Sequence, residues 1–89
     1  MCAIIGFTSP RLKKEQVQPY FEKTKSRGPD DTRMEPAGSG LLGFHRLAIM
    51  GLTPAGMQPF ALDGSYAVCN GEIYGFEALK AALASKYTF

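Results

Sequence analysis

The stretch MCAIIGF, residues 1–7, places a cysteine directly before a short apolar run rich in β-branched residues. The run is followed by Thr8-Ser9-Pro10, so it predicts a buried strand that ends at a turn. Cys2 therefore lies at the mouth of a strand. If Met1 is removed, Cys2 carries a thiol and a free α-amine, which are a nucleophile and a base for acyl transfer. The alternative is an inert small residue at a frayed terminus.

A second stretch, VCNGEIY at residues 68–74, could supply the hydrogen-bond donors that a cysteine nucleophile needs beside it. The side-chain amide of Asn70 and the unhindered N–H of Gly71 place two donors side by side, which is the arrangement that holds the oxyanion of a tetrahedral intermediate. Asn-Gly is equally a signal for a tight turn. Cys69 is interpreted as a packed strand residue without a chemical role.

Two segments have helical periodicity. In residues 12–25, Val17, Tyr20, Phe21 and Thr24 share one stripe, while Pro19 interrupts the pattern. Either the helix begins near Gln18 with Pro19 in its first turn, or it is bent there. The second segment runs from Phe76 to about Ser85 and is amphipathic.

The middle of the chain predicts strands. Residues 32–36 form a weak strand, 37–40 a hairpin-like link, and 41–49 a second apolar strand. Residues 58–61 are expected to be extended, Asp63-Gly64 to form a hairpin turn, and 66–69 to return as a strand. Strand, helix, several antiparallel strands and helix make an α+β layer arrangement in one domain.

Arg46 lies within the apolar strand 41–49, where an arginine is costly unless it is paired. It could hold a carboxylate bidentately, or form a structural salt bridge, or point outward at the strand end. His45 is expected on the opposite face of the strand, as a packed or hydrogen-bonded side chain.

Composition limits the function classes. A net charge of +2 is too small to argue for nucleic acid, and the basic residues of 11–27 are interpreted as a solvated helix face. No stretch approaches the length of a membrane span. Two cysteines and one histidine form neither a disulfide framework nor a zinc spacing, so we expect a reducing, cytoplasmic location and no metal.

Five motifs carry a resemblance: MCAIIG at residues 1–6, RGPD at 27–30, HRLAI at 45–49, GMQP at 56–59 and NGEIY at 70–74. In order and spacing, they resemble the start of the glutamine amidotransferase domain of asparagine synthetases, a branch of the class II glutamine amidotransferases. The resemblance implies the N-terminal nucleophile hydrolase fold, in which layered antiparallel sheets are flanked by helices.

The resemblance also implies roles. Cys2 would attack the amide of glutamine, its α-amine would relay the proton, and Asn70 with the N–H of Gly71 would stabilise the oxyanion. Arg46 would hold the α-carboxylate and Glu72 the α-amine of glutamine. The glutaminase step would need no cofactor, because ATP and Mg belong to the synthetase domain, which is absent from residues 1–89.

The family domain is considerably longer than this chain, so residues 1–89 would be a partial type 2 domain. Two hypotheses follow. One is a glutaminase that supplies ammonia for asparagine synthesis through a partner synthetase domain. The other is a non-catalytic folding or interaction module that needs a complementary chain. Missing strands would leave residues 41–49 or 66–69 with unpaired edges, which predicts a homo-oligomer.

Overall fold

The computed structural model describes all residues, 1–89, and contains two antiparallel sheets and two α-helices. The order of elements is β1 (Ala3–Thr8), α1 (Lys14–Phe21), the 3-10 helix η1 (Glu22–Arg27), β2 (Asp31–Ala37), β3 (Gly40–Arg46), the 3-10 helix η2 (Pro54–Gly56), β4 (Phe60–Leu62), β5 (Ser65–Ala67) and α2 (Phe76–Leu83). The α+β class is as predicted. None of these helices is both long enough and apolar enough to cross a membrane.

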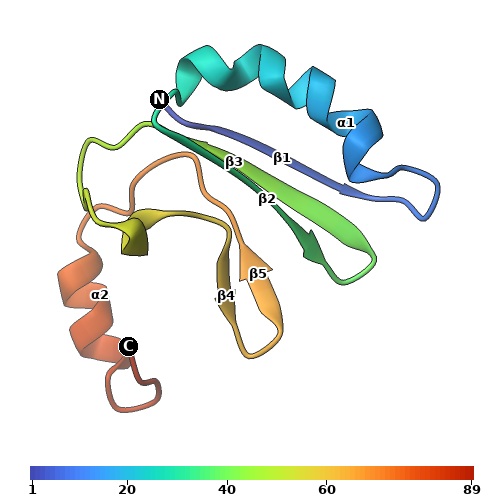
Figure 1. The fold of residues 1–89 in the computed structure, drawn as a ribbon. Coiled ribbons are helices and arrows are strands. Elements are labelled where there is room, and N and C mark those ends of the chain that lie inside the picture. The colour runs from blue at the N-terminus through green and yellow to red at the C-terminus, as the bar shows by residue number, and fades with distance from the viewer.

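The first sheet has the strand order β1-β3-β2 (Figure 1). Its register pairs Ala3 with His45 and Thr8 with Gly40 on one side of β3, and Ala37 with Gly40 on the other. The expected link at residues 37–40 is therefore the β2–β3 turn. Our expectation that residues 41–49 would have an unpaired edge is wrong, since β3 is the central strand.

The core lies between this sheet and the helical segment above it (Figure 1). Ala3, Met34 and Leu41 project from the three strands and are buried together with Phe21 of α1. Alternation along the strands explains the arrangement, because paired residues of antiparallel strands share a face. The opposite face of β1 is more open, and Ile4 is 45% exposed.

The helix differs from its prediction in two ways. It begins at Lys14 and contains Pro19 in its interior, so the alternative that starts near Gln18 is wrong. Tyr20 was expected on the buried stripe but is 69% exposed. After Phe21 the chain tightens into η1, which leaves the carbonyl of Phe21 free to accept a hydrogen bond from the hydroxyl of Thr24 (2.8 Å).

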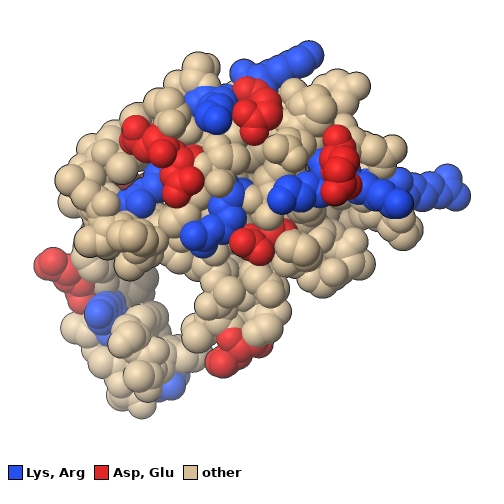
Figure 2. All heavy atoms as spheres, in the orientation of Figure 1, with Lys and Arg blue, Asp and Glu red and all other residues tan.

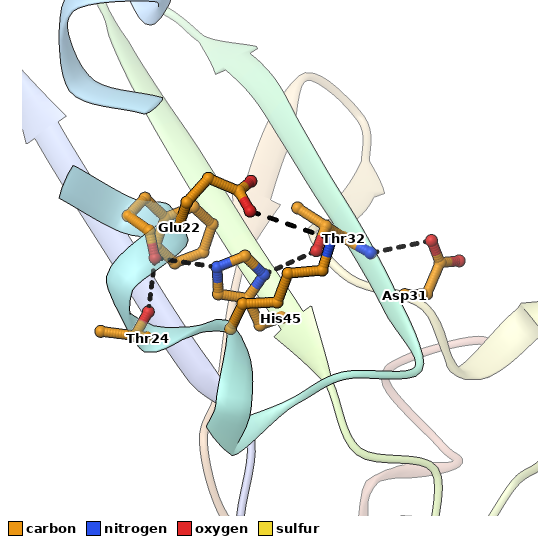
Figure 3. Close-up of polar contacts among 7 residues, drawn as sticks. Glu22, Thr24, Asp31, Thr32 and His45 are labelled. Carbon is orange, nitrogen blue, oxygen red and sulfur yellow. Dashed lines mark hydrogen bonds and ion pairs between the residues drawn. The ribbon is translucent and has the colours of Figure 1, made fainter. Parts of the chain in front are cut away.

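His45 joins the sheet to this helical segment, as Figure 3 shows. Its ring is fully buried and stacks on the ring of Phe21 with 3.8 Å between centroids. Nε2 lies 3.0 Å from the carbonyl of Phe21, and Nδ1 lies 2.6 Å from the hydroxyl of Thr32. Because a carbonyl only accepts, Nε2 carries the proton that is donated to Phe21. The prediction of a packed, hydrogen-bonded histidine is confirmed.

The second sheet is the β4–β5 hairpin, whose turn is the predicted Asp63-Gly64. Both turn residues have positive φ, 49° and 77°, as a tight two-residue hairpin requires. The strands are shorter than predicted: β5 ends at Ala67, and Cys69 is exposed rather than packed in a strand. α2 stands apart from the first sheet (Figure 1), and Phe76 and Leu79 on it remain half exposed.

Charged side chains are mixed over the visible face in Figure 2, where lysines and arginines lie among aspartates and glutamates. The two ion pairs in the structure, Lys25 with Glu22 and Arg33 with Glu35, are exposed and long at 3.8 and 3.9 Å. Exposed pairs of this kind contribute little to stability. The fold therefore depends on its small apolar core and on the hydrogen bonds of the sheet.

Candidate functional site

The end of the first sheet brings Cys2 and Arg46 together. The β1–β3 register pairs Ala3 with His45, so one residue further it places Cys2 opposite Arg46. Directly opposed residues project from the same face, which is the face away from the core around Phe21. A nucleophile candidate and a buried cation thus lie side by side because of the strand pairing.

The thiol of Cys2 is held by the backbone of Leu47. The N–H of Leu47 donates to Sγ (3.3 Å), and Sγ lies 3.7 Å from the carbonyl of the same residue. β3 consequently ends at Arg46 rather than at Ile49 as predicted, because the next backbone groups serve other partners. The N–H of Ala48, for example, donates to a carboxylate oxygen of Asp30 (2.7 Å).

The turn at residues 27–30 forms hydrogen bonds to the backbone of both Cys2 and Arg46. Arg27 donates from Nε to the carbonyl of Cys2 (3.4 Å), and the N–H of Asp30 donates to the carbonyl of Arg46 (2.9 Å). Together with the bond from Ala48 to Asp30, these contacts fix the backbone on which the thiol rests. In the sequence, this segment was singled out only as the RGPD motif of the family resemblance.

Gly28 is the residue that lets this turn approach β3. It is buried, and a Cβ at its position would lie 2.2 Å from the carbonyl oxygen of His45 and 2.8 Å from the nitrogen of Arg46. Only a residue without a side chain can pack the backbone this closely.

We expect Gly28→Ala to lower the free energy of unfolding by about 1–3 kcal/mol or more, because the clash is with backbone atoms that cannot turn away. Urea unfolding measures the change. Gly6→Ala is the matched control, since its new Cβ would approach only the flexible end of Leu42, at 3.0 Å. Equal midpoints for the two variants would contradict the packing argument.

Arg46 is 8% exposed and forms no salt bridge in the structure. Its Nη1 donates to the carbonyl of Thr53 (3.0 Å), and its Nη2 makes a short contact with the carbonyl of Gly51. The salt-bridge alternative is therefore excluded, and so is the alternative in which the side chain points outward. The guanidinium retains donors beyond those used for the two carbonyls.

A cavity of about 210 Å³ lies beside this pair. All five residues singled out in the sequence line it: Cys2, Arg46, Asn70, Gly71 and Glu72. Asn70, Gly71 and Glu72 belong to the segment between β5 and α2, which returns to the end of the first sheet in Figure 1. Apolar walls come from side chains that include Phe44, Ile49 and Met50.

Comparison with known proteins identifies the family of the chain. The profile of the glutamine amidotransferase domain family matches residues 1–89. The chain belongs to the glutamine amidotransferase domain family. This domain is 38% identical over 87 residues to a probable glutamine-hydrolyzing asparagine synthetase of Acanthamoeba polyphaga mimivirus. The aligned residues cover 89% of this chain and 16% of the relative.

Two further relatives match this glutamine amidotransferase domain. The glutamine-hydrolyzing asparagine synthetase 2 of Bacillus subtilis (strain 168) is 35% identical over 88 residues, 93% of this chain and 12% of the relative. The amidase chry2 of Gibberella zeae is 48% identical over 50 residues, 54% of this chain and 8% of the relative. The domain thus spans less than a fifth of each of these relatives. No solved structure matches it.

Sequence reasoning missed the residues that support the site of this glutamine amidotransferase domain. Leu47 acts through its backbone, so its side chain gives no signal. Asp30 and Gln58 lie in the RGPD and GMQP motifs, which were noticed only for their resemblance. Gln58 lines the cavity and also bonds to the backbone of Cys69 at two points.

Proposed function

We propose that this domain hydrolyses the side-chain amide of glutamine, with Cys2 as the nucleophile. One observation carries the proposal: a thiol, a buried unpaired guanidinium, an adjacent pair of amide donors and a carboxylate line the same cavity. Cys2 lies at the start of the chain, Arg46 at the end of β3, and the other groups between β5 and α2. Family membership supports the same reaction class.

The proposed reaction is acyl transfer in two steps. The sulfur of Cys2 forms a bond to the amide carbon, and the carbonyl electron pair moves to oxygen. The side-chain amide of Asn70 and the N–H of Gly71 stabilise that oxyanion. When the intermediate collapses, the C–N bond breaks and the nitrogen leaves as ammonia after taking a proton. Water then hydrolyses the thioester to glutamate and restores the thiol.

The proton relay is assigned to the α-amine of Cys2. The single histidine cannot serve as the base, because it is buried in the core and both of its ring nitrogens are engaged. An α-amine has a pKa of about 7.7–8.0 in model compounds, which suits proton transfer near neutral pH. Met1 must therefore be removed for turnover, because it converts this nitrogen into an amide.

Glutamine recognition is assigned to Arg46 and Glu72, for the α-carboxylate and the α-amine respectively. The buried guanidinium of Arg46 supports the first assignment, because a desolvated cation without an anion is costly and a ligand carboxylate would compensate it. Glu72 is exposed at the cavity and could accept from the ammonium group. The glutaminase step so described uses no metal and no cofactor.

In the complete gene product, the ammonia would pass to a synthetase domain that makes asparagine, and ATP and Mg would act there. The names of two relatives support this proposal for the whole protein.

Substitution of Arg46 tests the assignment of the α-carboxylate. We expect Arg46→Lys to raise the KM for glutamine by about 10- to 100-fold, with little change in kcat, because a charge-assisted contact made in ground and transition states alike is weakened. Release of glutamate and ammonia is measured in the complete gene product.

Arg33→Lys is the control, since Arg33 lies on β2 and is exposed. Arg46→Ala is a less specific variant, because it also frees the carbonyls of Gly51 and Thr53 and should loosen the loop that follows β3. A fall in kcat at unchanged KM in Arg46→Lys would count against the carboxylate role.

A further inference from the structure

The β4–β5 ladder ends where Pro59 enters the chain. Its last backbone pair is Phe60 with Ala67, and the same register places Pro59 opposite Val68 and Gln58 opposite Cys69. In an antiparallel hairpin, hydrogen-bonded pairs alternate with non-bonded ones, beginning with the bonded pair that flanks a two-residue turn. By this alternation Gln58 and Cys69 occupy a hydrogen-bonded position of the ladder.

At that position the side chain of Gln58 takes the place of its backbone N–H and C=O. The N–H of Cys69 donates to Oε1 of Gln58 (2.6 Å), and Nε2 of Gln58 donates to the carbonyl of Cys69 (3.2 Å). A primary carboxamide can point its C=O and one N–H to the same side, as the backbone C=O and N–H of one strand residue do, so it can complete both bonds. The ladder is thus extended by one pair beyond the end of β5.

The segment fixed in this way leads directly into Asn70 and Gly71. Gln58 is itself flanked by two buried residues, Met57 and Pro59, and it lines the same cavity as Cys2. The segment 70–72 is exposed and lies outside every helix and strand. The two bonds to Cys69 are the side-chain hydrogen bonds that hold it next to the cavity.

We propose that Gln58 is a positioning residue for the two oxyanion donors. This inference rests on the proposed function, since it assumes that Asn70 and Gly71 hold the oxyanion of the glutamine amide. Gln58 does not touch the reacting atoms. It sets the position from which the neighbouring amide groups point into the cavity, and a misplacement of about 1 Å in such groups can cost about 100-fold in rate.

The expected result for Gln58→Ala, in the complete gene product, is a decrease of about 10- to 100-fold in both kcat and kcat/KM, because only a transition-state interaction is impaired. KM for glutamine should change less than about threefold, since Arg46 is untouched and the exposed Glu72, which the released segment carries, makes a contact that contributes little to affinity. Gln58→Glu should behave similarly, because a carboxylate keeps an acceptor for the N–H of Cys69 but turns its second oxygen toward the carbonyl of the same residue.

Gln18→Ala is the matched control, because Gln18 is exposed on α1 and its side chain makes no hydrogen bond in the structure. Its kcat and KM should equal those of the unchanged protein. If Gln58→Ala is not obtained folded, Gln58→Glu serves for the same measurement, since its side chain has nearly the same shape.

A double-mutant cycle with Asn70→Ala separates positioning from a general structural role. Asn70→Ala alone should lower kcat by roughly 10²–10³. In that background, the further loss from the Gln58 substitution should shrink markedly, because one of the groups it positions is gone. Losses that multiply fully would overturn the inference, as would an unchanged kcat in both Gln58 variants.

The Cys2 and Gln58 variants test the proposed function and the positioning role separately. If Cys2→Ala retains glutamine hydrolysis, the proposed function is wrong. If Cys2→Ala is inactive while the Gln58 variants keep full kcat, only the positioning role of Gln58 is wrong.

Discussion

Cys2→Ala is expected to abolish glutamine hydrolysis, with a loss on the order of 10⁶ in kcat, the scale observed when a protease loses its nucleophile. No second thiol can substitute, because Cys69 is exposed and is not among the residues that line the cavity. In the complete gene product, synthesis that uses free ammonia should continue, since only acyl transfer from glutamine requires the thiol. Both activities are measured on one preparation.

Cys69→Ser provides the control for this substitution. The backbone of Cys69 is bound by Gln58, but its side chain makes no hydrogen bond in the structure, so its replacement should be mild. The assignment would be reversed if Cys69→Ser lost activity while Cys2→Ala retained it.

Retention of Met1 is expected to have an effect of similar size. A chain that keeps Met1 has an amide nitrogen at Cys2, and an amide has no basic lone pair to take the proton of the thiol. Met1 also lines the cavity, so it occupies space beside the nucleophile. We therefore expect glutamine turnover only from the species that begins at Cys2.

Intact mass identifies the two species, and their glutaminase rates are compared after separation. Titration of thiols with an alkylating reagent is the control, because the sulfur of Cys2 should be reactive in both species even when turnover is lost. Glutamine hydrolysis by a preparation shown to retain Met1 would disprove the role of the α-amine.

Local signals in the sequence predicted the elements that depend on local physics. The apolar run at residues 3–7, the turn at Asp63-Gly64 and the helix that begins at Phe76 were all placed correctly. Hydrophobic period and turn chemistry determine these elements, and both can be recognised without knowledge of the remaining chain.

Element ends that depend on distant partners were not predictable. β3 stops at Arg46 because Cys2 and Asp30 accept the next backbone donors, and neither partner is near it in sequence. Tyr20 has the helical spacing of a buried residue, yet it is exposed, while Phe21 carries the contact with the sheet. A pattern of period 3.6 identifies a stripe but not which of its members meets the sheet.

The candidate site was largely predictable as a set of residues and hardly at all as a geometry. Cys2 and Arg46 were noticeable because their residue types are unusual at their positions. Asn70 and Gly71 were noticeable as two adjacent donors, and Glu72 only through the family resemblance. Their common cavity follows from strand register and from the return of residues 68–72, which no local pattern specifies. Gln58 was not predicted as a site residue, because a glutamine in an extended segment gives no hint that its side chain completes a strand ladder.

Burial is uneven along the chain, so the two parts of the site differ in how easily they open. Every core residue of the main cluster lies in the first half, whereas residues 60–89 are almost all exposed. Segments with few buried contacts open locally at a low cost in free energy, without unfolding of the rest. We therefore expect the part of the cavity formed by the first sheet to exchange its amide protons slowly, and the part formed by residues 70–72 to exchange them fast. A molecule that binds in the cavity would stabilise mainly the exposed segment, so occupancy of the cavity and order in residues 68–72 are thermodynamically linked.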